Sequence, residues 1–194
     1  MARTQAHDYQ DKRDAIMAAA ARLFGASGFA GTSMSELAKA CHMSKSLLYH
    51  YYPAKEDILR DVTGQHMREL MRLIEHFDMD GQGPEDTLLL FTQELLACYA
   101  GAQDYQKVLL YEIEALPEQA QKDIKKQQRK LIRFVEDMFS RFPNAAHRPR
   151  SELRARVMLY FGMMNWVHTW HRPDGEISRG DLARLASHIM TSSV

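Results

Sequence analysis

The chain has 194 residues, of which 45% are apolar, so it can form one large packed domain or two small ones. Its formal net charge of zero gives no indication of nucleic-acid binding, although a local basic patch remains compatible with it. Cys41 and Cys98 are far apart and belong to no CxxC motif, which favours free thiols in a reducing compartment. We find no signal segment, and the longest apolar stretch, 157–167, is too short to span a bilayer. We therefore expect a soluble cytoplasmic protein without a membrane partner.

The first ten residues are polar, and we expect a disordered leader there, with Arg3 reaching DNA as the alternative. A helix is predicted over residues 11–27, because apolar side chains recur at helical spacing: Ile16, Ala19, Ala20, Leu23 and Phe24. Gly28 is a natural residue just beyond a helix end.

Residues 28–59 are the most informative stretch of the chain. A short helix follows Thr32 and Ser33 and directs Leu37 and Ala38 inward, and the pattern breaks over residues 41–43. A second short helix starts at Ser44, directs Leu48 and Tyr52 inward, and ends before Pro53, which disfavours helical backbone in the preceding residue. Two short helices around a tight turn predict a helix-turn-helix, in which one helix enters a groove about 12 Å wide.

The second short helix is predicted to present polar side chains to solvent. Lysine neutralises phosphate charge, and hydroxyl and imidazole groups donate to phosphate oxygens. Ser44 is placed as N-cap of this helix, and Thr32 and Ser33 precede the other helix in the same way. An ordinary polar surface helix is the alternative for any one of these residues. We predict the following DNA-binding residues: Thr32, Ser33, Ser44, Lys45, Ser46, Leu47, Tyr49, His50, Tyr51 and Lys55.

The stretch closely resembles the DNA-binding domain of the TetR family of one-component transcription regulators. The resemblance rests on Thr32 and Ser33, on residues 38–45, on residues 48–50 and on residues 53–59. It implies that the residues matching these six positions contact DNA, mostly its phosphates: Thr32, Lys45, Tyr49, His50, Tyr51 and Lys55.

The sequence departs from the family pattern at three places. His42 stands where glycine is usual, and histidine tolerates a positive φ better than most residues, at some strain. Ser46 and Leu47 replace a small pair, so Leu47 either meets a thymine methyl or packs within the protein. Tyr52 replaces phenylalanine, and its hydroxyl needs a partner or water.

The rest of the chain is helical in period. A helix of about 24 residues starts near Ala54 and is long enough to leave the head. After a linker at 81–84, helices are predicted over 85–100, 103–115, 117–142, 151–171 and 178–190. We find no strand-like alternation and no repeat. The fold class is therefore predicted to be all-α, with about nine helices: a helix-turn-helix domain at 1–53 and a ligand-binding and dimerisation domain at 54–194.

The helix predicted over 151–171 is apolar nearly all round, which indicates burial on most sides. By resemblance to the family, the last two helices pair with their copies in a four-helix homodimer interface; the interior helix of a monomer is the alternative. Residues 1–60 carry eight basic and six acidic side chains, so a single head binds DNA weakly and two are favoured. A dimer implies an inverted-repeat operator in double-stranded DNA.

The remaining helices are expected to hold a pocket for a small effector. We expect a repressor that leaves its operator when the effector binds. Ligand pockets are mostly apolar with a few polar groups. The candidate lining residues, each also acceptable as ordinary core, are Phe91, Leu95, Tyr99, Tyr105, Leu109, Tyr111, Ile113, Phe134, Met138, Phe161, Met164, Asn165, Trp166 and His168.

Residues 161–166 and 169–175 resemble TetR-type regulators of fatty-acid and aromatic-acid breakdown, which implies an acyl-CoA effector, with phenylacetyl-CoA as the nearest suggestion. The phosphates of CoA need cationic partners in the protein. The candidate cations, which can equally form a solvated helix face, are Lys107, Lys122, Lys125, Lys126, Arg129, Lys130 and Arg133.

We find none of the GxSxG, P-loop, HExxH or GxGxxG motifs and no Glu-x-x-His pair, so no enzyme activity and no cofactor are predicted. His168 and His171 are three residues apart on one predicted helix, and we predict packing and solvent roles instead of a metal site. A helical protein-interaction module that does not bind DNA is the remaining alternative.

Overall fold

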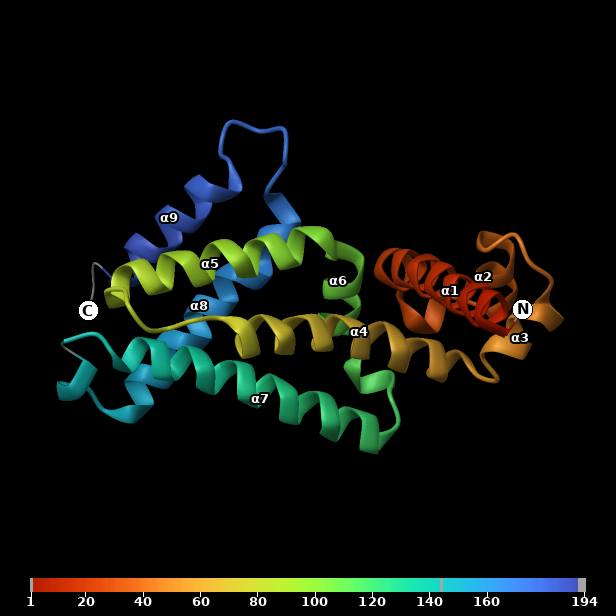
Figure 1. Ribbon diagram of the computed structural model, residues 1–194, viewed down its shortest axis with the longest axis horizontal. Helices are drawn as coiled ribbons and strands as arrows, with labels where there is room; N and C mark the ends of the chain where they lie inside the picture. The colour runs from red at the N-terminus through yellow and green to blue at the C-terminus, as the bar shows by residue number, and fades with distance from the viewer. Residues whose placement is uncertain (1, 144, 192–194) are drawn as a thin grey trace. The chain divides into compact units, whose positions relative to one another are not determined.

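The computed structural model describes residues 2–143 and 145–191, without the side chains of residues 2–6 and 146. Over this range the chain forms nine α-helices and two short 3-10 helices and no strand, which confirms the predicted all-α class (Figure 1). The chain divides into two compact units, Met1–Arg68 with Ala102–Lys125, and Glu69–Gly101 with Lys126–Val194. The boundary predicted at residue 53 lies between α3 and α4, and the first unit extends beyond it into α4 and also includes α6.

Helix α1 (Ala2–Gly31) begins nine residues earlier than predicted, so the expected disordered leader is wrong. Polar side chains one turn apart pair along its exposed start: Lys12 donates to Asp8 at 2.8 Å, and Gln10 donates to Asp14 at 2.8 Å. Such i, i+4 pairs support a helix that carries no apolar stripe. The side chain of Arg3 lies outside the described part of the chain. Gly28 interrupts the helix with a φ of 75°, as its predicted place at a helix end requires.

The head of the first unit consists of α1, α2 (Met34–Ala40) and α3 (Lys45–Tyr51), which lie together in Figure 1. The four side chains predicted to point inward from the two short helices are all buried: Leu37, Ala38, Leu48 and Tyr52. Ile16 and Phe24 of α1 are also buried, and α1 and α3 both contact α2. The core fixes which side of α3 remains in solvent.

Helix α4 (Lys55–His76) leaves the head, and α6 (Gln103–Tyr111) packs along α1 in the same unit. The close approach is at Gly25, where an added Cβ would lie 3.6 Å from the carbonyl oxygen of Asp104. The helix predicted over 103–115 ends earlier, at Tyr111, and a 3-10 turn η1 (Ile113–Ala115) follows. Pro117 holds Leu116 extended, at a ψ of 152°, and so stops the helical backbone.

The second unit contains α5 (Pro84–Gly101), most of α7 (Glu118–Ser140), the turn η2 (Ala145–His147), α8 (Arg150–Trp170) and α9 (Arg179–Thr191). Helix α9 packs along α5, and α8 contacts both (Figure 1). No helix in the described ranges is long and apolar enough to cross a membrane.

A buried polar cluster joins these three helices. The Thr92 hydroxyl donates to the Leu88 carbonyl at 2.6 Å, and it accepts from the hydroxyls of Tyr160, at 3.0 Å, and Ser187, at 3.4 Å. Burial raises the pKa of Tyr160, so its hydroxyl stays a donor. These hydrogen bonds give the buried hydroxyls of all three helices a partner.

Helix α8 has one face buried within the chain and a second face in solvent, which disfavours the alternative of an interior helix of a monomer. Val157, Tyr160, Phe161 and Met164 form its buried face. A second apolar face is 49% to 67% exposed and comprises Met158, Leu159, Trp166 and Trp170. A helix that is apolar all round can be interior or can cover a partner, and periodicity does not separate the two.

Candidate nucleic-acid interface

The recognition candidate α3 starts at a well-formed N-cap. Ser44 has extended backbone, and its hydroxyl accepts a hydrogen bond from the Leu47 amide at 3.1 Å, as predicted for a capping serine. The Ser44 and Ser46 hydroxyls lie 3.1 Å apart. Ser46, in the first turn of the helix, is therefore in contact with the cap.

One face of α3 is in solvent, and it carries Lys45, Ser46, Leu47, Tyr49 and His50. Leu47 is 39% exposed, which favours contact with a thymine methyl over packing within its own chain. The Lys45 ammonium lies 5.9 Å from the centre of the Tyr49 ring, and no acid among the described residues forms an ion pair with it. This face can donate to phosphates through Lys45 and Tyr49 and can offer Leu47 to an apolar group.

Tyr51, at the end of α3, is only half exposed. Its ring lies 4.8 Å from the ring of Tyr9 in α1, centre to centre, and 5.6 Å from the imidazole of His50. The early start of α1 thus supplies an aromatic partner that the predicted leader would have lacked.

Helix α2 is fixed by a reciprocal cap. The Ser33 hydroxyl accepts from the Glu36 amide at 3.2 Å, and the Glu36 carboxylate accepts from the Ser33 amide at 2.7 Å. The hydrogen bond from the Ser33 amide lowers the pKa of Glu36 below its ordinary value. Ser33 remains exposed beside this cap.

The turn between α2 and α3 requires a left-handed residue, and His42 supplies it with a φ of 54°. The His42 amide donates to the Lys39 carbonyl at 3.1 Å and the Met43 amide to the Ala38 carbonyl at 3.0 Å. This pair of hydrogen bonds closes the end of α2 in the Schellman arrangement, in which glycine is favoured at the His42 position. His42, in place of the usual glycine, therefore has the strained positive φ that the sequence predicted.

Tyr52, the third departure, has two partners for its hydroxyl. It donates to the Asp61 carboxylate at 2.9 Å, and the Arg13 guanidinium donates to it from Nε at 3.2 Å. Arg13 also forms an ion pair with Asp61. Arg13 and Asp61 were missed in the sequence, and the only signal for them was the unexplained tyrosine hydroxyl.

Two of the ten predicted DNA-binding side chains are turned into the head. Thr32 is 3% exposed, and its hydroxyl donates to the Gly28 carbonyl at 2.9 Å, so that hydrogen is not directed at a phosphate. The Lys55 ammonium donates to the carbonyls of Phe29 and Thr32, both at 2.7 Å, and lies 4.1 Å from the centre of the Phe29 ring. Both residues close the junction of α1 and α2, and Lys55 keeps one hydrogen of its ammonium for another acceptor.

The candidate effector residues are divided between the two units. Tyr105, Leu109, Tyr111 and Ile113 belong to the first, and the other ten to the second. Phe91 packs on Phe77 and Phe134 with ring centres 5.3 and 5.4 Å away, and Leu95, Met138 and Met164 are buried near-completely. The remaining members of the second unit are Tyr99 and Phe161, both buried, and Asn165 and His168, both half-buried.

Trp166 and Tyr111 differ from the other candidates, because each is 61% exposed. Trp166 lies on the outer apolar face of α8 and does not line an interior site of its own unit. Two nearby histidines donate to backbone carbonyls: His168 from Nδ1 to the Asn165 carbonyl at 2.6 Å, and His171 from Nε2 to the Ile177 carbonyl at 3.0 Å.

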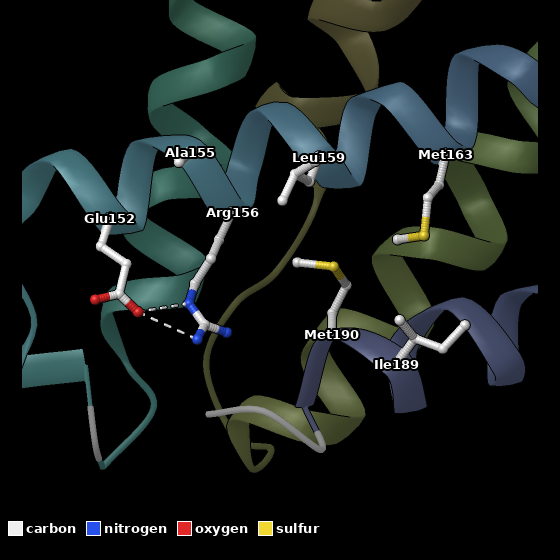
Figure 2. Close-up of a pocket in the computed structure, with 7 residues that line it drawn as sticks. All are labelled: Glu152, Ala155, Arg156, Leu159, Met163, Ile189 and Met190. Carbon is white, nitrogen blue, oxygen red and sulfur yellow. Dashed lines mark hydrogen bonds and ion pairs between the residues drawn. The ribbon is translucent and has the colours of Figure 1, made fainter.

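A groove of about 480 Å³ runs between α8 and α9 on the second unit. Figure 2 shows that its walls are the apolar side chains of Leu159, Met163, Ile189 and Met190. At one end Arg156 donates to the Glu152 carboxylate from Nε and Nη2, both at 3.2 Å (Figure 2). None of the candidate effector residues lines this groove.

Comparison with known proteins accounts for both parts of the chain. Residues 16–62 match the model of bacterial regulatory proteins of the tetR family, and residues 81–194 match the tetracyclin repressor-like C-terminal domain. A TetR-family transcriptional regulator from Bordetella parapertussis is 34% identical, with a TM-score of 0.87 over 92% of this chain and 93% of that chain.

Two further relatives are more distant. AibR, solved in complex with isovaleryl coenzyme A and operator DNA, is 24% identical, with a TM-score of 0.76 over 92% of this chain and 97% of that chain. The HTH-type transcriptional regulator YuxN of Bacillus subtilis is 24% identical over 105 residues, 54% of this chain. The matches cover between 28% and 53% of the length of the curated relatives.

Proposed function

The chain belongs to the TetR family of bacterial transcriptional regulators, and from this premise we propose a dimeric repressor that is released from an inverted-repeat operator by an acyl-CoA thioester. Members of the family are DNA-binding transcription factors and not enzymes.

The exposed face of α3 is the observation that carries the DNA-binding proposal. Leu48 anchors the helix in the core, and the exposed first turn presents Lys45, Ser46 and Leu47 to solvent. A helix held in this way can enter the major groove, where Lys45 contacts phosphate and Leu47 lies near a thymine methyl. Ser44, Ser33 and Tyr49 are exposed residues and remain phosphate candidates.

A gel-shift titration tests this directly, with the full-length protein and the DNA upstream of its own gene at low ionic strength. We expect binding by the wild type and weaker binding to all sequences by the Lys45→Ala, Tyr49→Phe double variant. Lys130→Ala, which removes an exposed lysine of α7, serves as the matched control and should bind as the wild type does. Unchanged affinity in the double variant would contradict the assignment of α3.

The outer faces of α8 and α9 support the dimer. Leu159, Trp166 and Trp170 on α8 and Leu185 and Ile189 on α9 are all at least half exposed, and the groove of Figure 2 lies between the two helices. Contiguous apolar surface of this kind is rare on a monomer and marks an interface. A second copy of the chain is the occupant we propose, because two heads supply twice the phosphate contacts of one.

Sedimentation analysis of two glutamate variants tests the dimer. Leu159→Glu places a charge in the groove wall and should produce a monomer. Leu90→Glu places the same charge on an exposed leucine of α5 and should leave the dimer intact. If both variants remain dimeric, the interface lies elsewhere.

The acyl-CoA effector is supported by the resemblance of residues 161–175 and by AibR, whose solved complex contains isovaleryl coenzyme A. On α7, Lys126, Arg129, Lys130 and Arg133 are exposed cations suited to phosphates, whereas Lys122 is paired with Glu118 at 2.5 Å and Lys125 with Glu114 at 3.1 Å. Such a ligand can move the two heads only if it binds the DNA-free conformation of the protein more tightly than the DNA-bound conformation.

A DNA-release screen tests the effector. Acyl-CoA thioesters, with phenylacetyl-CoA among them, are added to the protein–operator complex, and the corresponding free acids are the controls. We expect thioesters alone to release the DNA, and an Arg129→Ala, Arg133→Ala variant to need more of them. Release by the free acids, or by no thioester, would contradict the acyl-CoA assignment and leave the DNA-binding proposal standing.

A further inference from the structure

Three side chains from three helices meet behind the recognition helix. Arg13 comes from α1, Tyr52 follows the last residue of α3, and Asp61 lies in the second turn of α4. The Arg13 guanidinium donates to the Tyr52 hydroxyl at 3.2 Å, and the Tyr52 hydroxyl donates to the Asp61 carboxylate at 2.9 Å. An ion pair between Arg13 and Asp61 closes the ring of contacts.

The tyrosine hydroxyl in this ring is not needed to fill the core. Tyr52 is 2% exposed, and its ring occupies the place where the family usually has phenylalanine. The Arg13 guanidinium also lies 4.9 Å from the centre of that ring. Burial raises the pKa of Tyr52 to about 12, so the hydroxyl keeps its proton and its direction as a donor to Asp61. Phenylalanine would therefore keep the packing and lose only the two hydrogen bonds.

The position of Tyr52 makes these hydrogen bonds a constraint on α3. Its amide still donates to the Leu48 carbonyl, at 2.9 Å, so the residue moves with the helix. Its side chain is tied at the same time to α1 and α4. Rotation or sliding of α3 would break the hydrogen bond to Asp61, and the helix is held in one orientation.

We propose that Arg13, Tyr52 and Asp61 are positioning residues for operator recognition, which hold α3 so that Ser46 and Leu47 meet the edges of specific bases. The inference rests on the proposed function and deepens it. Base-edge contacts need geometry within about 0.5 Å, whereas a long lysine side chain follows a phosphate over a wider range. The ring therefore contributes to the preference for the operator over other DNA, and little to binding in general.

A direct phosphate contact by Arg13 is the competing role, and the geometry disfavours it. The guanidinium directs hydrogens from two of its nitrogens at Tyr52 and Asp61, and the carboxylate neutralises its charge. The two roles differ in their salt dependence. A phosphate contact contributes about 0.9 to the slope of log affinity against log salt, and a positioning residue contributes nothing.

The test compares Tyr52→Phe with Tyr160→Phe in the full-length protein. Both variants remove the hydroxyl of a buried tyrosine, and Tyr160 belongs to the second unit, where its partner is Thr92. Affinities are measured for the operator fragment and for a scrambled duplex. We expect Tyr52→Phe to weaken operator binding about tenfold, by analogy with the loss of hydrogen bonds to charged groups, with scrambled-duplex binding and the salt slope unchanged.

Tyr160→Phe should leave both affinities as in the wild type. Equal weakening of operator and scrambled DNA by Tyr52→Phe, or the same loss in both tyrosine variants, would overturn the positioning role. Asp61→Asn gives a second measurement, because it keeps an acceptor for the tyrosine and removes the charge that neutralises Arg13. It should lower the operator preference without weakening scrambled-duplex binding, and an unchanged preference would count against the ring. A wild type that binds no DNA would instead refute the proposed function itself.

Discussion

Lys45 provides the sharpest quantitative prediction. It is the first residue of α3, it is exposed, and it has no acidic partner among the described residues, in contrast to Lys55, whose ammonium is held by two backbone carbonyls. With α3 placed on DNA as proposed, Lys45→Ala removes one phosphate contact from each head and two from a dimer. At about 0.9 per contact, the salt slope should decrease by about 1.8.

The size of the effect follows from that slope. Between 50 and 200 mM salt, the operator affinity of the wild type should fall about twelvefold more than that of Lys45→Ala. Fluorescence anisotropy titrations at four salt concentrations measure both slopes, and Lys126→Ala, on exposed α7, is the matched control. Equal slopes of log affinity against log salt for the wild type and Lys45→Ala would show that this lysine contacts no phosphate and would refute the proposed placement of α3.

Three further predictions concern the head and the interface. His42→Gly should stabilise the protein by about 0.5–1 kcal/mol in urea unfolding, because glycine adopts the φ of 54° without strain; a loss of stability would contradict this. The lowered pKa of Glu36 means that its cap with Ser33 is fully present above the ordinary glutamate pKa and is lost as the pH falls through the folded value. Glu36→Gln should reduce this decrease in the free energy of unfolding at acid pH, and an unchanged decrease would exclude the cap as its source. Trp166→Ala should weaken the dimer in sedimentation and leave effector-induced release intact at protein concentrations that keep the dimer assembled; the opposite result would place Trp166 in the effector site.

The helix-turn-helix could be predicted from sequence because its information is local. The spacing of Leu37 and Leu48, the caps and Pro53 fix two short helices and their inward faces, and the structure has the same helices within one or two residues. His42 was informative about the backbone, because it stands at a turn position where glycine is usual and a positive φ is needed. The leader failed as a prediction because its helix rests on polar pairs such as Asp8 with Lys12, and apolar periodicity does not register these.

The direction of individual side chains was harder to predict. The Thr32 hydroxyl and the Lys55 ammonium satisfy backbone carbonyls at a kinked junction, and no residue pattern shows that the kink creates such acceptors. The ring joins Arg13 to Asp61, 48 positions apart, and the sequence indicated only that the Tyr52 hydroxyl needs a partner, not which residues supply it. Trp166 was assigned to a pocket because an interior helix and an interface helix have the same composition.

The most direct test of the account is the stoichiometry of the protein–DNA complex, measured by analytical ultracentrifugation with the promoter fragment at low ionic strength. We expect two chains on one inverted repeat, since α3 of each chain occupies one half-site and the outer faces of α8 and α9 join them. Material that sediments as a single chain, and leaves every promoter fragment unbound, would contradict it.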